Sequence, residues 1–190
     1  YRYYLNQDED NIILVTNRGE MFFFLKTDLI NQKKFKLKKI NTNIEEIIDK
    51  EYIEDFNVIV KGILIIDQKI YISYINNNNE CYSNAILVGN LNTKKINFSQ
   101  FFKLKECKNR FNLSVGGNLQ KFKNNKILLT VGDYKSYEQV NENNIFEDDP
   151  QNIKSYYGKI LSIDLDTKNI DILSMGHRNS QGLFYDFKED

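Results

Sequence analysis

One internal repeat constrains the fold of this chain more than any other feature. Residues 85–96 read Ala-Ile-Leu-Val-Gly-Asn-Leu-Asn-Thr-Lys-Lys-Ile, and residues 159–170 read Lys-Ile-Leu-Ser-Ile-Asp-Leu-Asp-Thr-Lys-Asn-Ile. The two segments align without a gap, and each has the pattern of two short strands around a polar turn. A second matching pair, residues 69–73 and 126–130, precedes them, and the insertion of residues 133–157 lengthens the later copy. Four strands per copy are typical of a propeller blade.

The repeat therefore predicts an all-β fold, a β-propeller of four-stranded antiparallel blades. We expect blades at about residues 12–40, 58–105 and 116–175, the first of them incomplete, and the start of another at residues 182–190. Because a propeller closes with about four to eight blades, the roughly two and a half to three blades of this chain predict a fragment of a larger propeller. A single helix is predicted, over residues 43–54, with Asn43 as its N-cap.

The charges of the chain are balanced and exclude some classes of partner. It has 26 basic and 26 acidic residues among 190, so its formal net charge is zero. Binding to nucleic acid or to an anionic membrane surface depends on neutralising phosphates, and the composition therefore argues against both. No apolar run has the length of a membrane span. No signal peptide is recognisable at Tyr1 to Tyr4.

The two cysteines, Cys81 and Cys107, are placed symmetrically about the polar turn at residues 92–95. Folding of this segment as a hairpin brings the two sulfur atoms opposite one another, apart from shifts caused by bulges. Two interpretations are open: a pair of reduced thiols, or a structural disulfide of an oxidising compartment, which we favour.

A polar segment between two glycines is the main candidate for function. Gly176 to Gly182 reads Gly-His-Arg-Asn-Ser-Gln-Gly and contains His177, the one histidine of the chain. Its imidazole, guanidinium and amide groups are donors suited to an anionic or carbonyl-rich partner. An aromatic and aliphatic strand is predicted directly after it, at residues 183–186.

This segment resembles the Gly-His-Arg-Asn-Pro-Gln-Gly motif of the soluble quinoprotein glucose and sorbosone dehydrogenases, with Ser180 in place of the proline. Three more segments are similar to that family: Gly116-Gly117-Asn118-Leu119, the strand end Thr130-Val131-Gly132-Asp133, and Gly158-Lys159-Ile160-Leu161. The resemblance covers about residues 112–186, and the first fifty or so residues match weakly.

The resemblance implies a six-bladed parent propeller that binds pyrroloquinoline quinone (PQQ), assisted by calcium, and oxidises aldose sugars. In that family a histidine removes the proton of the sugar hydroxyl while hydride passes to the quinone. The cofactor contacts of the motif correspond to Arg178 and Asn179. The resemblance also implies a small-molecule sugar as partner and a periplasmic or extracellular location.

One departure from the family bears directly on activity. The position of the catalytic histidine is occupied here by Ser114, and the arginine of the Gly-Gly-Arg-Leu segment is replaced by Asn118. A serine hydroxyl is not a base at neutral pH unless another group deprotonates it. Two functions therefore stay open: a divergent dehydrogenase with reduced or absent activity, or a non-catalytic propeller that binds carbohydrate or protein. For Arg178 and His177 the alternative role is to hold the loop by bonding to neighbouring groups.

Two further groups of residues in the insertion are weaker candidates. Glu147, Asp148 and Asp149 are either ligands of a hard cation or a solvated acidic loop, and no metal-ligand set is assigned. Four tyrosines either stack on a sugar ring or pack the loop against the blade: Tyr134, Tyr137, Tyr156 and Tyr157.

Overall fold

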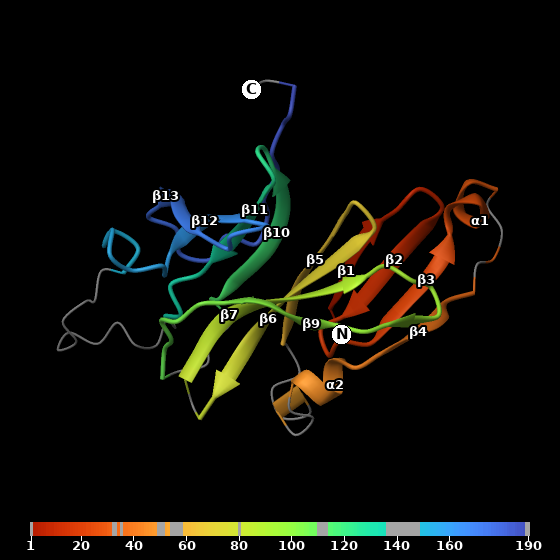
Figure 1. Cartoon of the computed structure of the whole chain (residues 1–190), viewed down its shortest axis with the longest axis horizontal. Helices are drawn as coiled ribbons and strands as arrows, with labels where there is room; N and C mark the ends of the chain where they lie inside the picture. Colours follow the sequence, from red (N-terminus) through yellow and green to blue (C-terminus); the bar gives the residue numbers. More distant parts are fainter. Residues whose placement is uncertain are drawn as a thin grey trace. The chain divides into compact units, whose positions relative to one another are not determined.

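The computed structural model describes residues 2–31, 34, 36–48, 52–53, 59–79, 81–109, 114–135 and 149–188. The fold is all-β, with one five-stranded and two four-stranded sheets (Figure 1). The helical residues of the described ranges are the short helices α1 and α2 and residues 52–53. The chain forms two compact units, which we describe separately: a first unit of Tyr1–Tyr74 and Ala85–Phe102, and a second unit of Ile75–Asn84 and Lys103–Asp190.

The first unit contains the five-stranded sheet, in the order β1-β2-β3-β4-β8. Strands β1 to β4 are antiparallel neighbours, and β8 pairs with β4 in parallel. Their bounds are β1 Tyr3–Gln7, β2 Asn11–Thr16, β3 Met21–Leu25, β4 Lys38–Thr42 and β8 Lys95–Ile96, and helix α1 (Lys26–Ile30) follows β3. The buried face carries Ile13, Val15, Met21, Ile40 and Ile96. Strand β1, which the sequence analysis did not predict, alternates exposed and half-buried residues and so has no apolar run to mark it.

The helix predicted at residues 43–54 is interrupted in the structure. Helix α2 covers Ile44–Ile47 and ends at Ile48, whose backbone is extended. Asn43 does not cap the helix through its side chain. Its amide instead pairs with the backbone of Phe98, donating to the carbonyl oxygen at 3.1 Å and accepting from the N–H at 2.7 Å. Tyr52 and Ile53 are helical, as predicted, and residues 49–51 and 54 of the prediction lie outside the described residues.

A four-stranded sheet in the order β5-β6-β7-β9 is divided between the two units. Its strands are β5 Val60–Ile66, β6 Lys69–Asn78, β7 Cys81–Asn90 and β9 Ser99–Lys103. In the first unit, β5 and β6 pair antiparallel with Ile63 opposite Ile72 and Ile65 opposite Ile70. The outer ends of β6 and β7, Ile75–Asn84, belong to the second unit.

The second unit contains a sheet of four consecutive antiparallel strands (Figure 1). They are β10 Gly116–Phe122, β11 Lys126–Val131, β12 Lys159–Asp164 and β13 Ile170–Met175. The pairs Ile127–Ile163 and Leu129–Leu161 face each other across β11 and β12, and all four side chains are fully buried. The repeat found in the sequence matches β6 with β11 and β7 with β12, the second and third strands of the two four-stranded sheets. Beyond the polar turn the copies differ, since Ile96 lies in β8 of the five-stranded sheet and Ile170 lies in β13. The all-β prediction, with four-stranded sheets of the propeller-blade type, is confirmed.

The strand predicted at residues 183–186 is absent: residues 176–186 have no regular secondary structure. A strand is part of a hydrogen-bonded ladder, and the ladders of the described residues do not include residues 183–186. Tyr185 instead packs edge-to-face against Phe122 of β10 and against Phe187, with ring centroids 4.7 Å apart in both pairs.

Candidate functional site

The candidate site lies at one end of the β10–β13 sheet, in the second unit. In the strand register, Gly116 lies opposite Val131, Val131 opposite Lys159, and Lys159 opposite Met175. The segments that continue from this row of residues are 114–115, 132–135, 149–158 and 176–181. All residues predicted for the site are therefore carried by neighbouring strand ends.

The start of β10 is shaped by a bulge and by a close approach of two backbones. The register shifts between Gly116 and Leu119, and the backbone N–H groups of Gly117 and Asn118 both donate to the Thr130 hydroxyl, at 3.0 and 2.9 Å. A Cβ at Gly132 would lie 2.0 Å from the carbonyl oxygen of Ser114, so this position requires glycine. The same carbonyl oxygen accepts a hydrogen bond from the Tyr134 N–H at 3.0 Å. Ser114 is thus held against the end of β11.

The motif loop at residues 176–182 is fixed mainly by backbone hydrogen bonds. The N–H of Gly176 donates to the Pro150 carbonyl at 2.8 Å, and the N–H of His177 donates to the Gly158 carbonyl at 3.0 Å. The Arg178 carbonyl accepts from the Asp133 N–H at 2.8 Å. The loop is therefore attached both to the insertion and to the end of β11.

Two amide side chains attach the same loop to the start of β10. The side-chain oxygen of Asn179 accepts a hydrogen bond from the Gly116 N–H at 3.1 Å. In the other direction, the Asn118 amide donates to the Gln181 carbonyl at 2.8 Å. The structure thus brings Asn179 to the segment that begins at Ser114, although positions 114 and 179 are 65 residues apart in the sequence.

Arg178 is close to the buried carboxylate of Asp133, a residue for which the sequence predicted no role. Its Nε lies 4.0 Å from Oδ2 of Asp133, whose side chain is 8% exposed against 41% for that of Arg178. Burial raises the pKa of Asp133, and the Lys135 N–H, which donates to its Oδ1 at 3.0 Å, and the Arg178 charge oppose that rise. The cost of burying the Asp133 carboxylate is therefore only partly offset by the hydrogen bond from Lys135 and by the Arg178 charge.

His177 is used to hold the loop. Its Nε2 lies 2.8 Å from the hydroxyl oxygen of Ser174 on β13, and its N–H is bonded to Gly158. These contacts are the ones expected from the loop-holding interpretation.

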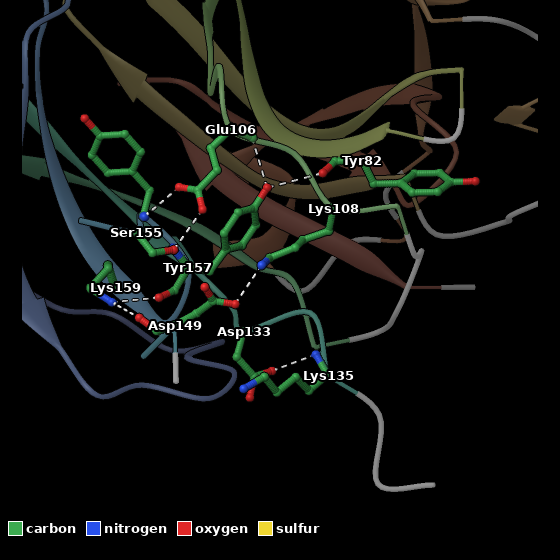
Figure 2. A network of polar contacts seen from close by, with 10 residues as sticks. Tyr82, Glu106, Lys108, Asp133, Lys135, Asp149, Ser155, Tyr157 and Lys159 are labelled. Atoms are coloured by element: carbon green, nitrogen blue, oxygen red, sulfur yellow. Dashed lines mark hydrogen bonds and ion pairs between the residues drawn. The ribbon is translucent and has the colours of Figure 1, made fainter. Parts of the chain in front are cut away.

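A buried polar network supports the insertion beneath the motif loop (Figure 2). Lys159, at the start of β12, is fully buried and donates to the carbonyl groups of Asp149, Pro150 and Tyr157. The carboxylate of Asp149 in turn pairs with Lys108 at 2.7 Å. An ammonium group that is fully buried requires such partners, because desolvation disfavours an unpaired charge.

The segment after β9 holds the other side of this network. The Tyr157 hydroxyl donates to the Glu106 carbonyl at 3.0 Å, and the Glu106 carboxylate accepts from the Ser155 hydroxyl and the Tyr156 N–H, both at 2.9 Å (Figure 2). Burial, together with the negative charges of Glu106 and Asp149, raises the pKa of Tyr157 far above its usual value. Tyr157 is therefore a neutral hydrogen-bond donor.

The weaker candidates in the insertion are described only in part. Asp149 is engaged by Lys108, and Glu147, Asp148 and Tyr137 lie outside the described residues. In the described ranges, no group of three or more His, Cys, Asp or Glu side chains could hold a metal ion. Tyr134 and Tyr157 are 3% and 0% exposed, and their rings meet edge-to-face at 5.0 Å, so these two pack the insertion against the sheet.

The donor set nevertheless fits a cofactor such as PQQ, which has carboxylates and quinone oxygens. Arg178 offers a charged, planar set of N–H donors, and the NH2 group of Asn179 is not used by its hydrogen bond to Gly116. Ser114, which the sequence predicts at the position of the family's base, lies on the segment that Asn179 contacts through Gly116. The arrangement is suited to binding an anionic or carbonyl-rich molecule.

The antiparallel four-stranded sheets define an all-β protein of the propeller class. The family model for glucose/sorbosone dehydrogenase matches residues 9–190, and the chain therefore belongs to that family. A search of curated proteins finds no match. No helix in the described ranges is long and apolar enough to cross a membrane.

Proposed function

We propose that the chain is a divergent sugar dehydrogenase-like propeller that binds PQQ through Arg178 and Asn179 and oxidises aldose sugars weakly or not at all. The observation that supports this best is the hydrogen bond from the Gly116 N–H to Asn179. It attaches the motif loop to the segment carrying Ser114, so that cofactor-binding donors and the base position share one strand end. The proposal treats the sheets as blades at about residues 12–40, 58–105 and 116–175, with another beginning at residues 182–190.

The residues of this chain would contribute binding and orientation. When bound, PQQ supplies a quinone that accepts hydride. Arg178 would pair with its carboxylate or quinone oxygens, and the Asn179 NH2 group would donate a second hydrogen bond. Asp133, whose Oδ2 lies 4.0 Å from the Arg178 Nε, would help to hold the guanidinium in place. Calcium is proposed on the family resemblance, with no ligands assigned.

Loss of the proton acceptor limits the reaction. Removal of a general base typically lowers a rate by about 10²–10⁴-fold, and a serine at position 114 cannot take its place at neutral pH. The same substitution supports the second candidate, a non-catalytic propeller that binds carbohydrate or protein through this end of the sheet.

We also propose a periplasmic or extracellular location. The disulfide between Cys81 and Cys107 supports it, because such bonds persist in oxidising compartments.

The test is a titration of the chain with PQQ, with added calcium or with EDTA, followed by dye reduction with aldoses. We expect saturable PQQ binding that weakens at least about tenfold in Arg178→Ala and in Asn179→Ala, since each removes a donor. Ser114→His should raise dye reduction by roughly 10²-fold or more. Lys154→Ala, an exposed lysine of the insertion, is the charge-matched control for Arg178→Ala.

The outcomes separate the two candidates. Absence of PQQ binding in both the native chain and Ser114→His would reject the dehydrogenase pocket and favour the binding propeller. PQQ binding without any gain in Ser114→His would show that the pocket holds the cofactor while position 114 does not face the substrate.

A further inference from the structure

The second unit contains a pocket that shares none of its lining residues with the candidate site. Its volume is about 300 Å³, within the lower range of small-molecule sites, and it lies beside the Cys81–Cys107 disulfide. The polar side chains that line it are those of Asn78, Ser83, Lys103 and Lys105. We propose that this pocket binds a small oxyanion: a phosphate, a sulfate or the carboxylate of a sugar acid. The proposal does not depend on PQQ binding.

Two buried polar atoms support a ligand at this place. The hydroxyl oxygen of Ser83 and the side-chain nitrogen of Asn76 are buried and have no hydrogen-bond partner among the described residues. Ser83 lines the pocket directly. Asn76 precedes Asn78 by two residues on β6, and side chains two apart on a strand share a face, so Asn76 lies on the pocket side as well. An unpaired buried polar group is costly, and a ligand that accepts hydrogen bonds would remove that cost.

The charge of the lining determines the class of ligand. Lys103 and Lys105 contribute two ammonium groups, and none of the lining residues is acidic. The neighbouring Glu106 directs its carboxylate to Ser155 and Tyr156, where it is already engaged. Two ammonium groups, an amide nitrogen and a hydroxyl are all donors, and such a set recognises the oxygens of an anion by charge-assisted hydrogen bonds.

The walls of the pocket are cross-linked, which favours a preformed site. The disulfide holds the Cα atoms of Cys81 and Cys107 at 5.3 Å. Next to it, Tyr82 and Lys108 exchange two backbone hydrogen bonds, at 2.7 and 2.9 Å. The Leu104 N–H donates to the Asn84 carbonyl at 3.0 Å. The pocket backbone therefore loses little conformational entropy when a ligand binds, and such preorganisation favours affinity.

The test is an NMR titration of the 15N-labelled chain with phosphate, sulfate and an aldonate at constant ionic strength, with an uncharged aldose as the neutral probe. We expect saturable shifts at the backbone amides of Asn76, Ser83 and Lys105 with the anions. Lys103→Gln/Lys105→Gln should weaken binding at least about tenfold, and Ser83→Ala by about three- to tenfold. The anion that binds most tightly identifies the phosphate-type or the carboxylate source.

Matched controls make the result specific. Lys94→Gln/Lys95→Gln removes the same charge from two exposed side chains at and before the start of β8 and should leave the affinity unchanged. Without ligand, Ser83→Ala should be at least as stable as the native chain, because it removes an unpaired buried hydroxyl. The proposal is overturned if no anion gives a saturable shift, if the uncharged aldose binds equally well, or if both lysine pairs weaken binding to the same extent.

Discussion

Gly158 is the residue on which the placement of the motif loop depends most directly. Its φ is +69°, and a Cβ there would lie 2.5 Å from the His177 carbonyl oxygen and 2.7 Å from the Pro150 side chain. Gly158→Ala should lower the free energy of unfolding by about 2 kcal/mol or more, through backbone strain and the clash with the loop. Urea denaturation measures the loss.

Gly182, at the other end of the same loop, is the matched control. A Cβ added there would have no atom within 4 Å. Gly182→Ala should change the stability by no more than about 0.5 kcal/mol. Equal effects of the two substitutions would contradict the packing described for Gly158.

Asp133 should give the protein a characteristic pH dependence. Burial raises the pKa of its carboxyl above the ordinary value of 3.8, so the folded chain holds the proton more tightly than the unfolded chain. This contribution to stability is complete below the ordinary value and is lost as the pH rises through the raised pKa. Asp133→Asn does not titrate. The free energy of unfolding of the native chain, relative to Asp133→Asn, should therefore fall as the pH rises above 3.8. Denaturation curves at a series of pH values measure this difference, and a rise instead of a fall would refute the assignment.

At the scale of the elements, β12 fixes the insertion through Lys159. The variant Lys159→Met removes the ammonium group that donates to the carbonyl groups of Asp149, Pro150 and Tyr157. We expect a loss of about 3 kcal/mol and faster cleavage by trypsin after Lys154, because the insertion is no longer held against the sheet. Lys154→Met removes an exposed lysine and should be neutral in stability. Unchanged stability of Lys159→Met would mean that the network contributes little.

The elements that the sequence predicted are those with a strong local pattern. Strands β6, β7, β11 and β12 carry continuous apolar runs and recur in the repeat, so they could be predicted. Strand β1 could not, because its stability comes from pairing with β2 and its residues alternate without an apolar run. The helical spacing at residues 44–48 predicted a longer continuous helix than α2. The Asn43 side chain bonds to the backbone of Phe98 instead of capping the helix, and the backbone is extended at Ile48.

The candidate site was predictable to a similar extent. The motif predicted Arg178 and Asn179 as cofactor contacts, and the spacing to Gly116 predicted Ser114 as the base position. No local sequence pattern predicts the hydrogen bond between Asn179 and Gly116. Asp133 and Lys159 stood within matched segments, and their roles depend on burial and on partners distant in sequence. Buried charges of this kind are recognised once the fold shows what surrounds them.

At the scale of the whole molecule, the disulfide is the one covalent bond between distant parts of the chain in the described ranges. It joins Cys81 and Cys107 across 26 residues and confirms the pairing that the symmetric hairpin predicted. The chain-entropy model gives a stabilisation of about 3.5 kcal/mol for a loop of this length. Cys81→Ala/Cys107→Ala should lose about that amount, and added reductant should destabilise the native chain but not the variant.

The division of the chain into two compact units was not predictable from its periodicity. The boundary passes through β6, β7 and β9, each of which has an uninterrupted strand pattern. Alternation along a strand reports which face is buried, whereas a compact unit is defined by contacts between residues far apart in sequence.

The attachment of the motif loop has a consequence for how such a protein can change. Its links to Gly158, Pro150 and Asp133 use peptide groups, which every amino acid provides except for the missing N–H of proline. A reactive side chain at this strand end can therefore be exchanged while the loop keeps its place. The position of the loop and the chemistry of its side chains are therefore separable, and a substitution can change the chemistry without rebuilding the loop.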